Sequence, residues 1–378
     1  MTILYVTNLR FPTEKAHGWQ IAKMCEAYAA LGHEVILVVP VRKTPIQEDA
    51  FHYYGLAHDF PVVRLPVFDA FALPWLPRLV AFAVTEWSFY RAVRRYLRSA
   101  PHSEVLVTRD PFVTRLLAGH GAQVVFEVHD VSPRFAERHK SIARTADLVV
   151  STTHWNAEQL SKAWGAALRR PILVAPNAID PTLYAGLPPR DEARTRLGLP
   201  LAGRLAVYTG HLYAWKGVHA LAEASAHLPA DFRVLMIGGT PEDREAFAAY
   251  LAERKLERVV MVPHKPHAEA ALYLAAADVL VLPNSGKDWN SRHTTSPIKL
   301  FEYLAAKRPV VASDLPSIRE AVSDAEVRFV PPDDPVALAS AIVAAVGDAS
   351  RVASATALVA GRSWSKRADV ILQALQAL

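Results

Sequence analysis

Residues 278–312, DVLVLPNSGKDWNSRHTTSPIKLFEYLAAKRPVVA, decide the fold class of this chain. They contain two apolar runs, Asp278–Leu282 and Val310–Ala312, which are continuous and do not alternate with polar residues. Runs of this kind are typical of parallel strands that are covered on both faces. Between them, Ile298–Ala306 has the apolar spacing of a helix. The stretch therefore predicts a strand–helix–strand unit of a parallel sheet.

The same alternation of strands and helices extends along the rest of the chain. The other strand candidates are Ile3–Thr7, Glu34–Pro40, Val62–Pro66, Glu104–Thr108, Gln123–Val128, Asp147–Ser151, Ile172–Ala175, Leu205–Tyr208, Arg233–Ile237, Val259–Val262 and Val327–Val330. Helical patterns between them include Ile21–Leu31, Val218–His227 and Glu242–Glu253. We therefore expect an α/β protein with two Rossmann-like, doubly wound domains.

The domain boundary is expected near Arg170–Asn177, where one series of strands ends and another starts. We accordingly assign residues 1–172 to an N-terminal domain and residues 173–363 to a C-terminal domain. Residues 364–378 form an amphipathic helical pattern that follows no strand. We expect this helix to cross back and pack on the first domain, and a plain C-terminal helix of the second domain is the alternative.

Composition limits the classes of function. The chain has 378 residues, 51% of them apolar and 21% charged, which suits two ordinary globular domains. Its net charge of +5 suits an anionic substrate or an anionic membrane surface, but it is too diffuse to indicate nucleic acid. The single cysteine, Cys25, excludes an internal disulfide, and no signal-peptide pattern is present, so a cytoplasmic location is expected.

Residues 70–98 combine apolar and aromatic side chains with a run of arginines. Their apolar part is interrupted by Pro74, Pro77 and Arg78, and it is too short to span a bilayer as a helix. Such a segment can lie on an anionic lipid surface at the inner face of a membrane. The alternative, which we weight more heavily, is an amphipathic helix that covers the sheet and exposes a solvated basic face.

A first candidate site is Tyr208–Gly217, which runs from a strand end into a helix. Ligands of open parallel sheets bind beyond the carboxyl ends of the strands. Gly210 permits close approach of the backbone, and Lys216 at the next helix start would place an ammonium near a diphosphate. A loop with a solvated lysine is an equally common alternative.

A second candidate site is the segment Asn284–Tyr303, which follows another strand end. Ser296 is predicted as the N-cap and Pro297 as the first residue of a helix whose free N–H groups face an anion. Lys299 and Glu302 lie in its first two turns, where a carboxylate can bridge the two hydroxyls of a ribose. The polar stretch before the helix has no strand or helix pattern, which favours function over ordinary surface charges.

Two further candidates follow strands of the first domain. In Phe126–Asp130, a neutral His129 could donate a hydrogen bond to a sugar hydroxyl, with Asp130 orienting it, although a lone histidine is equally often structural. In Asn8–Gly18, the backbone amides near Ala16–Gly18 could face a phosphate. This loop lacks the G-x-G-x-x-G pattern, which argues against NAD or FAD.

The order and spacing of these motifs resemble the bacterial glycosyltransferase family 4, of GT-B architecture, over essentially the whole chain. The matching segments are FPTEKAHGWQIAKMCEAYAALGHEV at 11–35, EVHD at 127–130, APNAID at 175–180, TGHLYAWKG at 209–217, IGG at 237–239 and SPIKLFEYLAAKRPVVASD at 296–314. The resemblance implies two domains that face each other across a cleft, with the donor in the C-terminal domain and the acceptor on the N-terminal one.

The resemblance also implies roles for individual residues. Lys216 would contact the donor diphosphate, Glu302 the ribose, and His129 the transferred sugar near its anomeric carbon, so that His129 and Lys216 are the catalytic candidates. The other donor-site candidates are Ala16, His17, Gly18, Gly210, His211, Thr295, Ser296, Pro297 and Lys299, and those on the acceptor side are Arg109 and Asp130.

Two departures from the family pattern concern the sugar and the diphosphate. Many relatives have two glutamates eight positions apart, and the earlier position here is Thr294. Some relatives have an arginine where this chain has His211, which leaves less fixed positive charge beside Lys216.

We expect a retaining transferase that moves a sugar from a nucleotide-sugar to a hydroxyl of a glycan, a lipid-linked acceptor or a small molecule. No cofactor or metal is expected, because no metal-ligand spacing follows any strand. The alternatives are an epimerase or hydrolase of nucleotide-sugars on the same fold, and a non-catalytic binding member, which the absent glutamate at position 294 makes conceivable.

Overall fold

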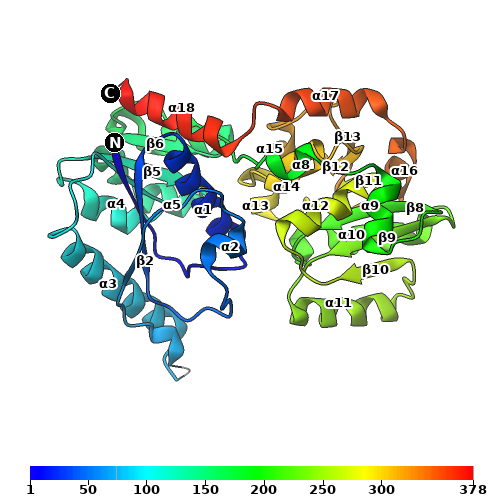
Figure 1. Ribbon diagram of the computed structural model, residues 1–378, viewed down its shortest axis with the longest axis horizontal. Helices are drawn as coiled ribbons and strands as arrows, with labels where there is room; N and C mark the ends of the chain where they lie inside the picture. The colour runs from blue at the N-terminus through cyan, green and yellow to red at the C-terminus, as the bar shows by residue number, and fades with distance from the viewer. Residues whose placement is uncertain (74, 378) are drawn as a thin grey trace. The chain divides into compact units, whose positions relative to one another are not determined.

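The computed structural model describes residues 1–73 and 75–377, so Pro74 and Leu378, which fall within two of the segments discussed above, lie outside the described residues. The chain divides into two compact units. The first contains Met1–Pro176 together with Trp364–Leu378, and the second contains Asn177–Ser363. Figure 1 shows a parallel sheet flanked by helices in each unit.

The first unit is built on a parallel sheet with the strand order β3-β2-β1-β4-β5-β6-β7. Its strands are β1 (Thr2–Val6), β2 (Glu34–Pro40), β3 (Val62–Leu65), β4 (Val105–Thr108), β5 (Gln123–Val128), β6 (Leu148–Ser151) and β7 (Leu173–Val174). The order reverses between β1 and β4, which is where open α/β sheets place their ligands.

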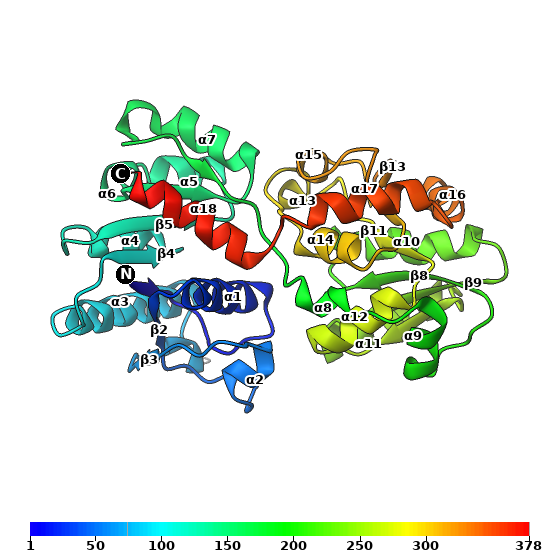
Figure 2. The same cartoon turned by 45° about the horizontal axis from the view of Figure 1, so that its top comes forward.

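Helices cover both faces of this sheet. They are α1 (Ala16–Ala30), α2 (Ala50–Tyr54), η1 (Ala70–Ala72), α3 (Arg78–Tyr96), α4 (Pro111–Leu117), α5 (Pro133–Arg138), α6 (Ile142–Thr145), α7 (His154–Trp164), η2 (Gly165–Ala167) and α18 (Trp364–Gln376). Phe89 and Val93 of α3 pack with Leu4 and Val6 of β1 on one face. On the other side α18 lies beside α1 (Figures 1 and 2). The rings of Trp364 and Trp19 are in edge-to-face contact there, with 5.6 Å between their centres.

The strand Leu173–Val174 corrects one expectation. The sequence assigned it to the second domain, but it pairs with β6, with Val150 opposite Leu173, and so closes the edge of the first sheet. The division between the units falls at Pro176 and Asn177. A two-residue strand carries no pattern that says which of two sheets it joins, so only the pairing itself decides.

The second unit contains a parallel sheet with the order β10-β9-β8-β11-β12-β13. Its strands are β8 (Arg204–Thr209), β9 (Phe232–Ile237), β10 (Val259–Val262), β11 (Val279–Leu282), β12 (Val310–Ser313) and β13 (Arg328–Val330). The order reverses between β8 and β11. The expected strand–helix–strand unit is therefore β11, the helix α14 (Ile298–Ala305) and β12, and it lies next to the reversal.

The helices of the second unit form a layer on each face of its sheet. They are α8 (Thr182–Ala185), α9 (Arg190–Leu197), η3 (Ala214–Lys216), α10 (Val218–Ala224), η4 (Ser225–His227), α11 (Pro241–Glu253), α12 (His267–Ala275), α13 (Trp289–His293), α14 (Ile298–Ala305), α15 (Pro316–Arg319), α16 (Pro335–Ala345) and α17 (Ala349–Val359). One core contains Leu280 and Leu300, with side chains of α12, α14 and α17. The other contains Val281 and Leu338, with side chains of α10, α11 and α16.

In the described part of the chain, no single helix is both long enough and apolar enough to cross a bilayer. Only α16 and α17 taken together meet the criteria of length and composition, and they are bent by 92° at the break between them.

Candidate functional site

The loops that follow β8 and β11 meet at the reversal of strand order in the second unit. The Ser285 N–H donates to the Trp215 carbonyl at 3.0 Å, which ties the two loops together. Gly217 has a φ of +72°, and a Cβ at this position would overlap the Pro283 carbonyl oxygen. The two glycine-containing loops can therefore approach more closely than side chains would allow.

Two lysines lie at this edge of the sheet. The Lys216 Nζ is 3.7 Å from the centre of the Trp215 ring, and the Lys299 Nζ is 3.4 Å from the Tyr208 hydroxyl. Burial and the neighbouring Lys299 lower the pKa of Lys216 well below its usual value. Burial lowers the pKa of Lys299 to about 8. Among the described residues neither ammonium forms an ion pair, although the charge of Asp288 raises the pKa of Lys216 and that of Glu302 raises the pKa of Lys299, each against the larger effect of burial.

Gly210 is the reason Lys299 can occupy its position. Its φ is +130°, and a Cβ there would overlap the Nζ of Lys299. The glycine that the sequence singled out for close backbone approach is thus approached by a lysine side chain of the same unit. His211, the next residue, stacks on Tyr213 at 4.8 Å, and burial followed by the charge of Lys299 lowers its pKa. His211 is therefore neutral at pH 7 and adds no fixed positive charge.

The start of α14 differs from the expected one. The helix begins at Ile298 with Pro297 as N-cap and no side-chain cap, so Ser296 is not the N-cap. The Ser296 hydroxyl instead accepts from the Asn177 N–H at 3.3 Å, and its carbonyl accepts from the Asn177 side-chain amide at 2.9 Å. These contacts join residues 119 positions apart, which a local capping pattern cannot reveal.

Several amides near this helix start are already used. The Thr295 N–H and hydroxyl both donate to the Asn290 carbonyl, and the Leu300 N–H donates to the Pro297 carbonyl. Since Pro297 has no N–H, the amides of Ser296, Ile298 and Lys299 remain, among the described residues, as donors for an anion.

Glu302 and Lys299 are not the surface charges of the simpler interpretation. Glu302 is only 8% exposed, and its Oε1 lies 3.6 Å from the His267 Nδ1. The Tyr184 hydroxyl lies beside the same carboxylate, and burial together with that carboxylate raises the pKa of Tyr184 well above its usual value. A buried carboxylate with polar neighbours has a fixed position, as recognition of a ribose diol requires.

The polar stretch before α14 is more regular than expected. It contains the short helix α13, capped by the Asp288 side chain, which accepts from the Ser291 N–H at 2.9 Å. Thr294 ends this helix, is 4% exposed, and directs its hydroxyl to the Asn290 carbonyl at 3.4 Å. Thr294 therefore contributes to packing at the position where many relatives have a glutamate.

The first unit contains a buried charge network at the carboxyl ends of β1, β4 and β5. Glu127 of β5 is 2% exposed and accepts hydrogen bonds from Arg109, Arg367 and the Tyr5 hydroxyl. Burial alone would raise the pKa of Glu127, but Arg109 and Arg367 outweigh it and hold that pKa well below the usual value. Arg367 comes from α18, so the C-terminal helix completes this network.

His129 is oriented by Glu127 and not by Asp130, contrary to expectation. Its Nε2 lies 3.1 Å from the Glu127 Oε1, whereas Asp130 is exposed. Burial, followed by the charge of Arg109, lowers the pKa of His129 to about 4. The neutral ring donates its Nε2 proton to the carboxylate, which leaves Nδ1 as an acceptor. The ring would thus accept a hydrogen bond from a sugar hydroxyl, not donate one.

Arg109 is largely engaged within the network. It donates to the Tyr5 hydroxyl at 3.0 Å, to the Gln20 side chain at 2.7 Å and to Glu127 at 3.3 Å. Three of its five N–H donors are therefore used, which leaves two for a ligand. Its first effect is to position Glu127 and, through it, His129.

The loop Asn8–Gly18 is fixed by Tyr54 of α2. The Tyr54 hydroxyl accepts from the Thr13 N–H at 2.7 Å and donates to the Thr13 carbonyl at 2.8 Å. Gly18 is the third residue of α1, and its N–H donates to the Lys15 carbonyl at 3.0 Å. The Gly18 amide is therefore not available to a phosphate, in contrast to the expectation for Ala16–Gly18. His17 is exposed.

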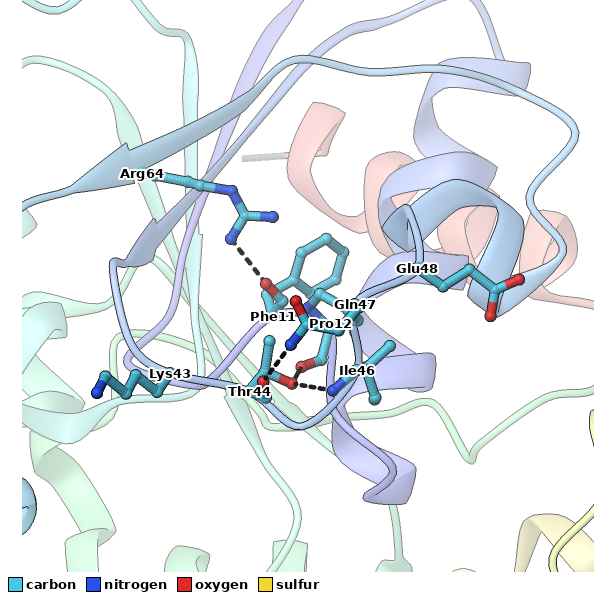
Figure 3. A pocket seen from close by; sticks show the side chains of 8 residues that line it. All are labelled: Phe11, Pro12, Lys43, Thr44, Ile46, Gln47, Glu48 and Arg64. Carbon is cyan, nitrogen blue, oxygen red and sulfur yellow. Dashed lines mark hydrogen bonds between the residues drawn. The ribbon is translucent and has the colours of Figure 1, made fainter.

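Two hollows in the first unit share Thr44. One, of about 400 Å³, is lined by polar residues of the Asn8–His17 loop with Arg42 and Phe71. The other is shown in Figure 3, where Arg64 donates to the Phe11 carbonyl at 2.7 Å and Thr44 to the Pro12 carbonyl at 2.9 Å. The first has the size of a small-molecule site.

The sequence interpretation missed Glu127 and Arg367. A usable signal was present for Glu127, which is a charged residue within the apolar run QVVFEV at a strand end. No comparable signal exists for Arg367, because it lies 240 residues away on an amphipathic helix.

Family models match both units. The model described as "Glycosyl transferase 4-like domain" matches residues 16–178, and the model described as "Glycosyl transferases group 1" matches residues 203–348. The chain belongs to glycosyltransferase family 4, with the GT-B fold of two Rossmann-like domains.

Among similar proteins, a D-inositol 3-phosphate glycosyltransferase of Xylanimonas cellulosilytica is 30% identical over 62% of this chain and 57% of that protein. The chain thus spans about half the length of this relative. The putative teichuronic acid biosynthesis glycosyltransferase TuaC of Bacillus subtilis is 24% identical over 90% of this chain and 88% of its own.

Solved structures resemble the whole chain. The sucrose-phosphate synthase of Thermosynechococcus elongatus has a TM-score of 0.79 at 21% identity and covers 100% of this chain and 98% of its own. Anabaena HepE in complex with UDP and glucose has a TM-score of 0.76 at 18% identity, with 100% of both chains covered.

Proposed function

We propose that the chain transfers a sugar, with retention of anomeric configuration, from a nucleotide-sugar bound in the second unit to a hydroxyl acceptor bound by the first. The observation that carries this proposal is that Lys216 and Lys299 lie at one edge of the sheet without an ion pair among the described residues, while the buried Glu302 lies on the same helix as Lys299. The two ammonium groups suit a diphosphate, and the carboxylate suits the ribose hydroxyls. HepE, whose solved structures contain UDP or UDP-glucose, adds support through its fold.

In the proposed reaction the bond between the anomeric carbon and the diphosphate oxygen breaks, and a bond to the acceptor oxygen forms on the same face. The leaving diphosphate gains negative charge in the transition state, and Lys216, Lys299 and the free amides at the start of α14 stabilise it. The acceptor proton passes to the leaving diphosphate. On the acceptor side, the Nδ1 of His129, held by Glu127, accepts a hydrogen bond from a sugar hydroxyl.

The proposal is tested first by ligand-induced thermal shifts. Screening with UDP-, GDP-, ADP- and TDP-sugars should reveal at least one that raises the melting temperature, because a ligand that binds only the folded state stabilises it. The shift should disappear in Lys216→Ala and in Glu302→Gln. Lys255→Ala, at an exposed residue that follows α11, should retain it. Donor binding that is intact in both site variants would refute the assignment of the site.

Product analysis then separates the alternatives. Transfer to an acceptor with retained configuration supports the proposal. Release of free sugar at full rate without an acceptor would assign a hydrolase. Binding of a nucleotide-sugar without turnover on any acceptor would show that the chain is a non-catalytic binding protein. The packed Thr294, at the position where many relatives have a glutamate, would then explain the absence of turnover.

A further inference from the structure

Large apolar side chains are exposed in one stretch of the first unit. Within residues 68–87 these side chains are 45% to 85% exposed, and they are Phe68, Phe71, Trp75, Leu79, Val80, Phe82 and Trp87. Single exposed apolar residues are normal on a soluble surface, but a contiguous group marks a surface that binds something. Figure 1 shows that α3, which carries four of them, lies at the outer edge of the unit.

The helix α3 is amphipathic in two senses. Its core face consists of residues four apart, Ala81, Thr85, Phe89 and Val93, which are all buried. The opposite face, again at spacings of three or four, begins with Leu79, Ala83 and Trp87 and continues with Arg91 and Arg94, all of them exposed. Arg98, also exposed, follows in the turn after the helix. The outward face is therefore apolar in its first half and basic in its second.

The basic half lacks counter-charges. Arg91, Arg94, Arg95 and Arg98 line a shallow hollow together with Trp87. The Arg91 guanidinium lies 4.8 Å from the Trp87 ring. In the described structure none of these four arginines forms an ion pair, and the one glutamate of the helix, Glu86, is turned to the Asn8 side chain.

We propose that this face, defined by the seven apolar residues above and by Arg91, Arg94, Arg95 and Arg98, docks on an anionic lipid surface. The apolar side chains would enter the boundary between head groups and acyl chains, Trp87 would lie at the level of the head groups, and the guanidiniums would bind lipid phosphates. The charge favours this occupant. A second copy of the same face would add further unpaired arginines without supplying a carboxylate.

The docking face adjoins the hollow at Asn8–His17, because Phe71 belongs to both. Given the glycosyl transfer proposed above, an acceptor carried by a membrane lipid would reach this hollow without leaving the surface. The docking itself does not depend on that activity.

Vesicle co-sedimentation of the full chain tests the proposal. The protein should bind vesicles of phosphatidylcholine mixed with phosphatidylglycerol more tightly than vesicles of phosphatidylcholine alone, and high salt should weaken that binding. Since each arginine near an anionic surface contributes about five-fold, Arg94→Ala/Arg98→Ala should lower the partition coefficient roughly 25-fold. The matched control, Lys140→Ala/Arg144→Ala, removes the same charge from exposed sites of the same unit and should change it less than two-fold.

The apolar half is tested by Leu79→Ser/Trp87→Ser, which should weaken vesicle binding roughly 10-fold or more. Both side chains are at least 60% exposed, so the fold is retained. The control Leu201→Ser/Val336→Ser changes exposed apolar residues of the second unit and should bind like the wild type. Equal binding of wild type and both α3 variants would overturn the proposal. A wild-type dimer that Leu79→Ser/Trp87→Ser converts to a monomer, without vesicle binding, would assign the face to a second copy.

Discussion

Lys299 should reduce the stability of the free protein while it strengthens binding of the donor. Its pKa is lowered from 10.5 to about 8. At about 1.4 kcal/mol per pKa unit, this fall corresponds to roughly 3 kcal/mol that the charged form loses on folding at pH 7. Replacement by methionine preserves the length of the side chain and removes the charge. Because the weak 3.4 Å contact to Tyr208 is also lost, we expect Lys299→Met to raise the free energy of unfolding by about 1–2 kcal/mol at pH 7.

The pH dependence of the stability difference between the wild type and Lys299→Met shows whether the charge of Lys299 causes it. The folded protein holds the Lys299 proton only below pH of about 8, whereas the unfolded chain holds it up to about 10.5. Between these values the unfolded state binds more protons, so the wild type gains stability as pH rises. The advantage of Lys299→Met should therefore be largest below pH 8 and should vanish near pH 10.5. Calorimetry of the full chain at several pH values measures this difference. Lys255→Met is an exposed control that should change the free energy of unfolding by less than about 0.5 kcal/mol.

The same variant should bind the donor less tightly. Loss of one hydrogen bond between a charged donor and phosphate is worth about 1.5–3 kcal/mol. This is roughly 10- to 100-fold in the dissociation constant, measured by titration calorimetry, of the nucleoside diphosphate whose sugar raises the melting temperature in the screen above. A Lys299→Met protein that is less stable at pH 7 and binds that nucleoside diphosphate as tightly as the wild type would refute the reasoning, because Lys299 would then be a structural lysine.

Three further outcomes follow from particular contacts. Gly210→Ala should displace the Lys299 ammonium and weaken binding of the same nucleoside diphosphate on the order of 10-fold. Gly186 has open space around it and an ordinary φ of −107°, so Gly186→Ala should not weaken binding. Equal affinities of the two variants would contradict the role of Gly210. Arg194→Met removes a fully buried guanidinium that binds Asp278 at 2.6 Å, and it should lower the free energy of unfolding by about 3–5 kcal/mol. Arg196→Met, at an exposed position of the same helix, should lower it by less than about 1 kcal/mol. Similar losses of the two variants in urea unfolding would show that burial is not the cause. The His129 pKa of about 4 lies below the value of about 6.5 in the unfolded chain, so the free energy of unfolding should fall, by on the order of 3 kcal/mol, as pH drops from 6.5 to 4. His129→Asn should remove this part of the pH dependence, and an unchanged slope would contradict the assignment.

Much of the architecture could be predicted from the chain itself. The apolar runs mark each strand to within a residue or two, since strands covered by helices on both faces need apolar side chains at nearly every position. The positions of Lys216, Lys299 and Glu302 after strands of the second unit could likewise be predicted, because the carboxyl ends of parallel strands share one edge. What these side chains bind remains a prediction.

The tertiary structure alone decided how those side chains are held. Glu302 is buried and Lys299 is half-buried, so neither is an ordinary surface charge, and Gly210 leaves room for the Lys299 ammonium. Ser296 binds Asn177 and does not cap its own helix, and Glu127 is neutralised by an arginine from the last helix of the chain. Local patterns report periodicity and capping within a few residues. Contacts between residues more than a hundred positions apart depend on how the elements pack. The amino-acid sequence therefore indicates which edge of each sheet carries the candidate site, and packing determines the charges and the proton positions at that edge.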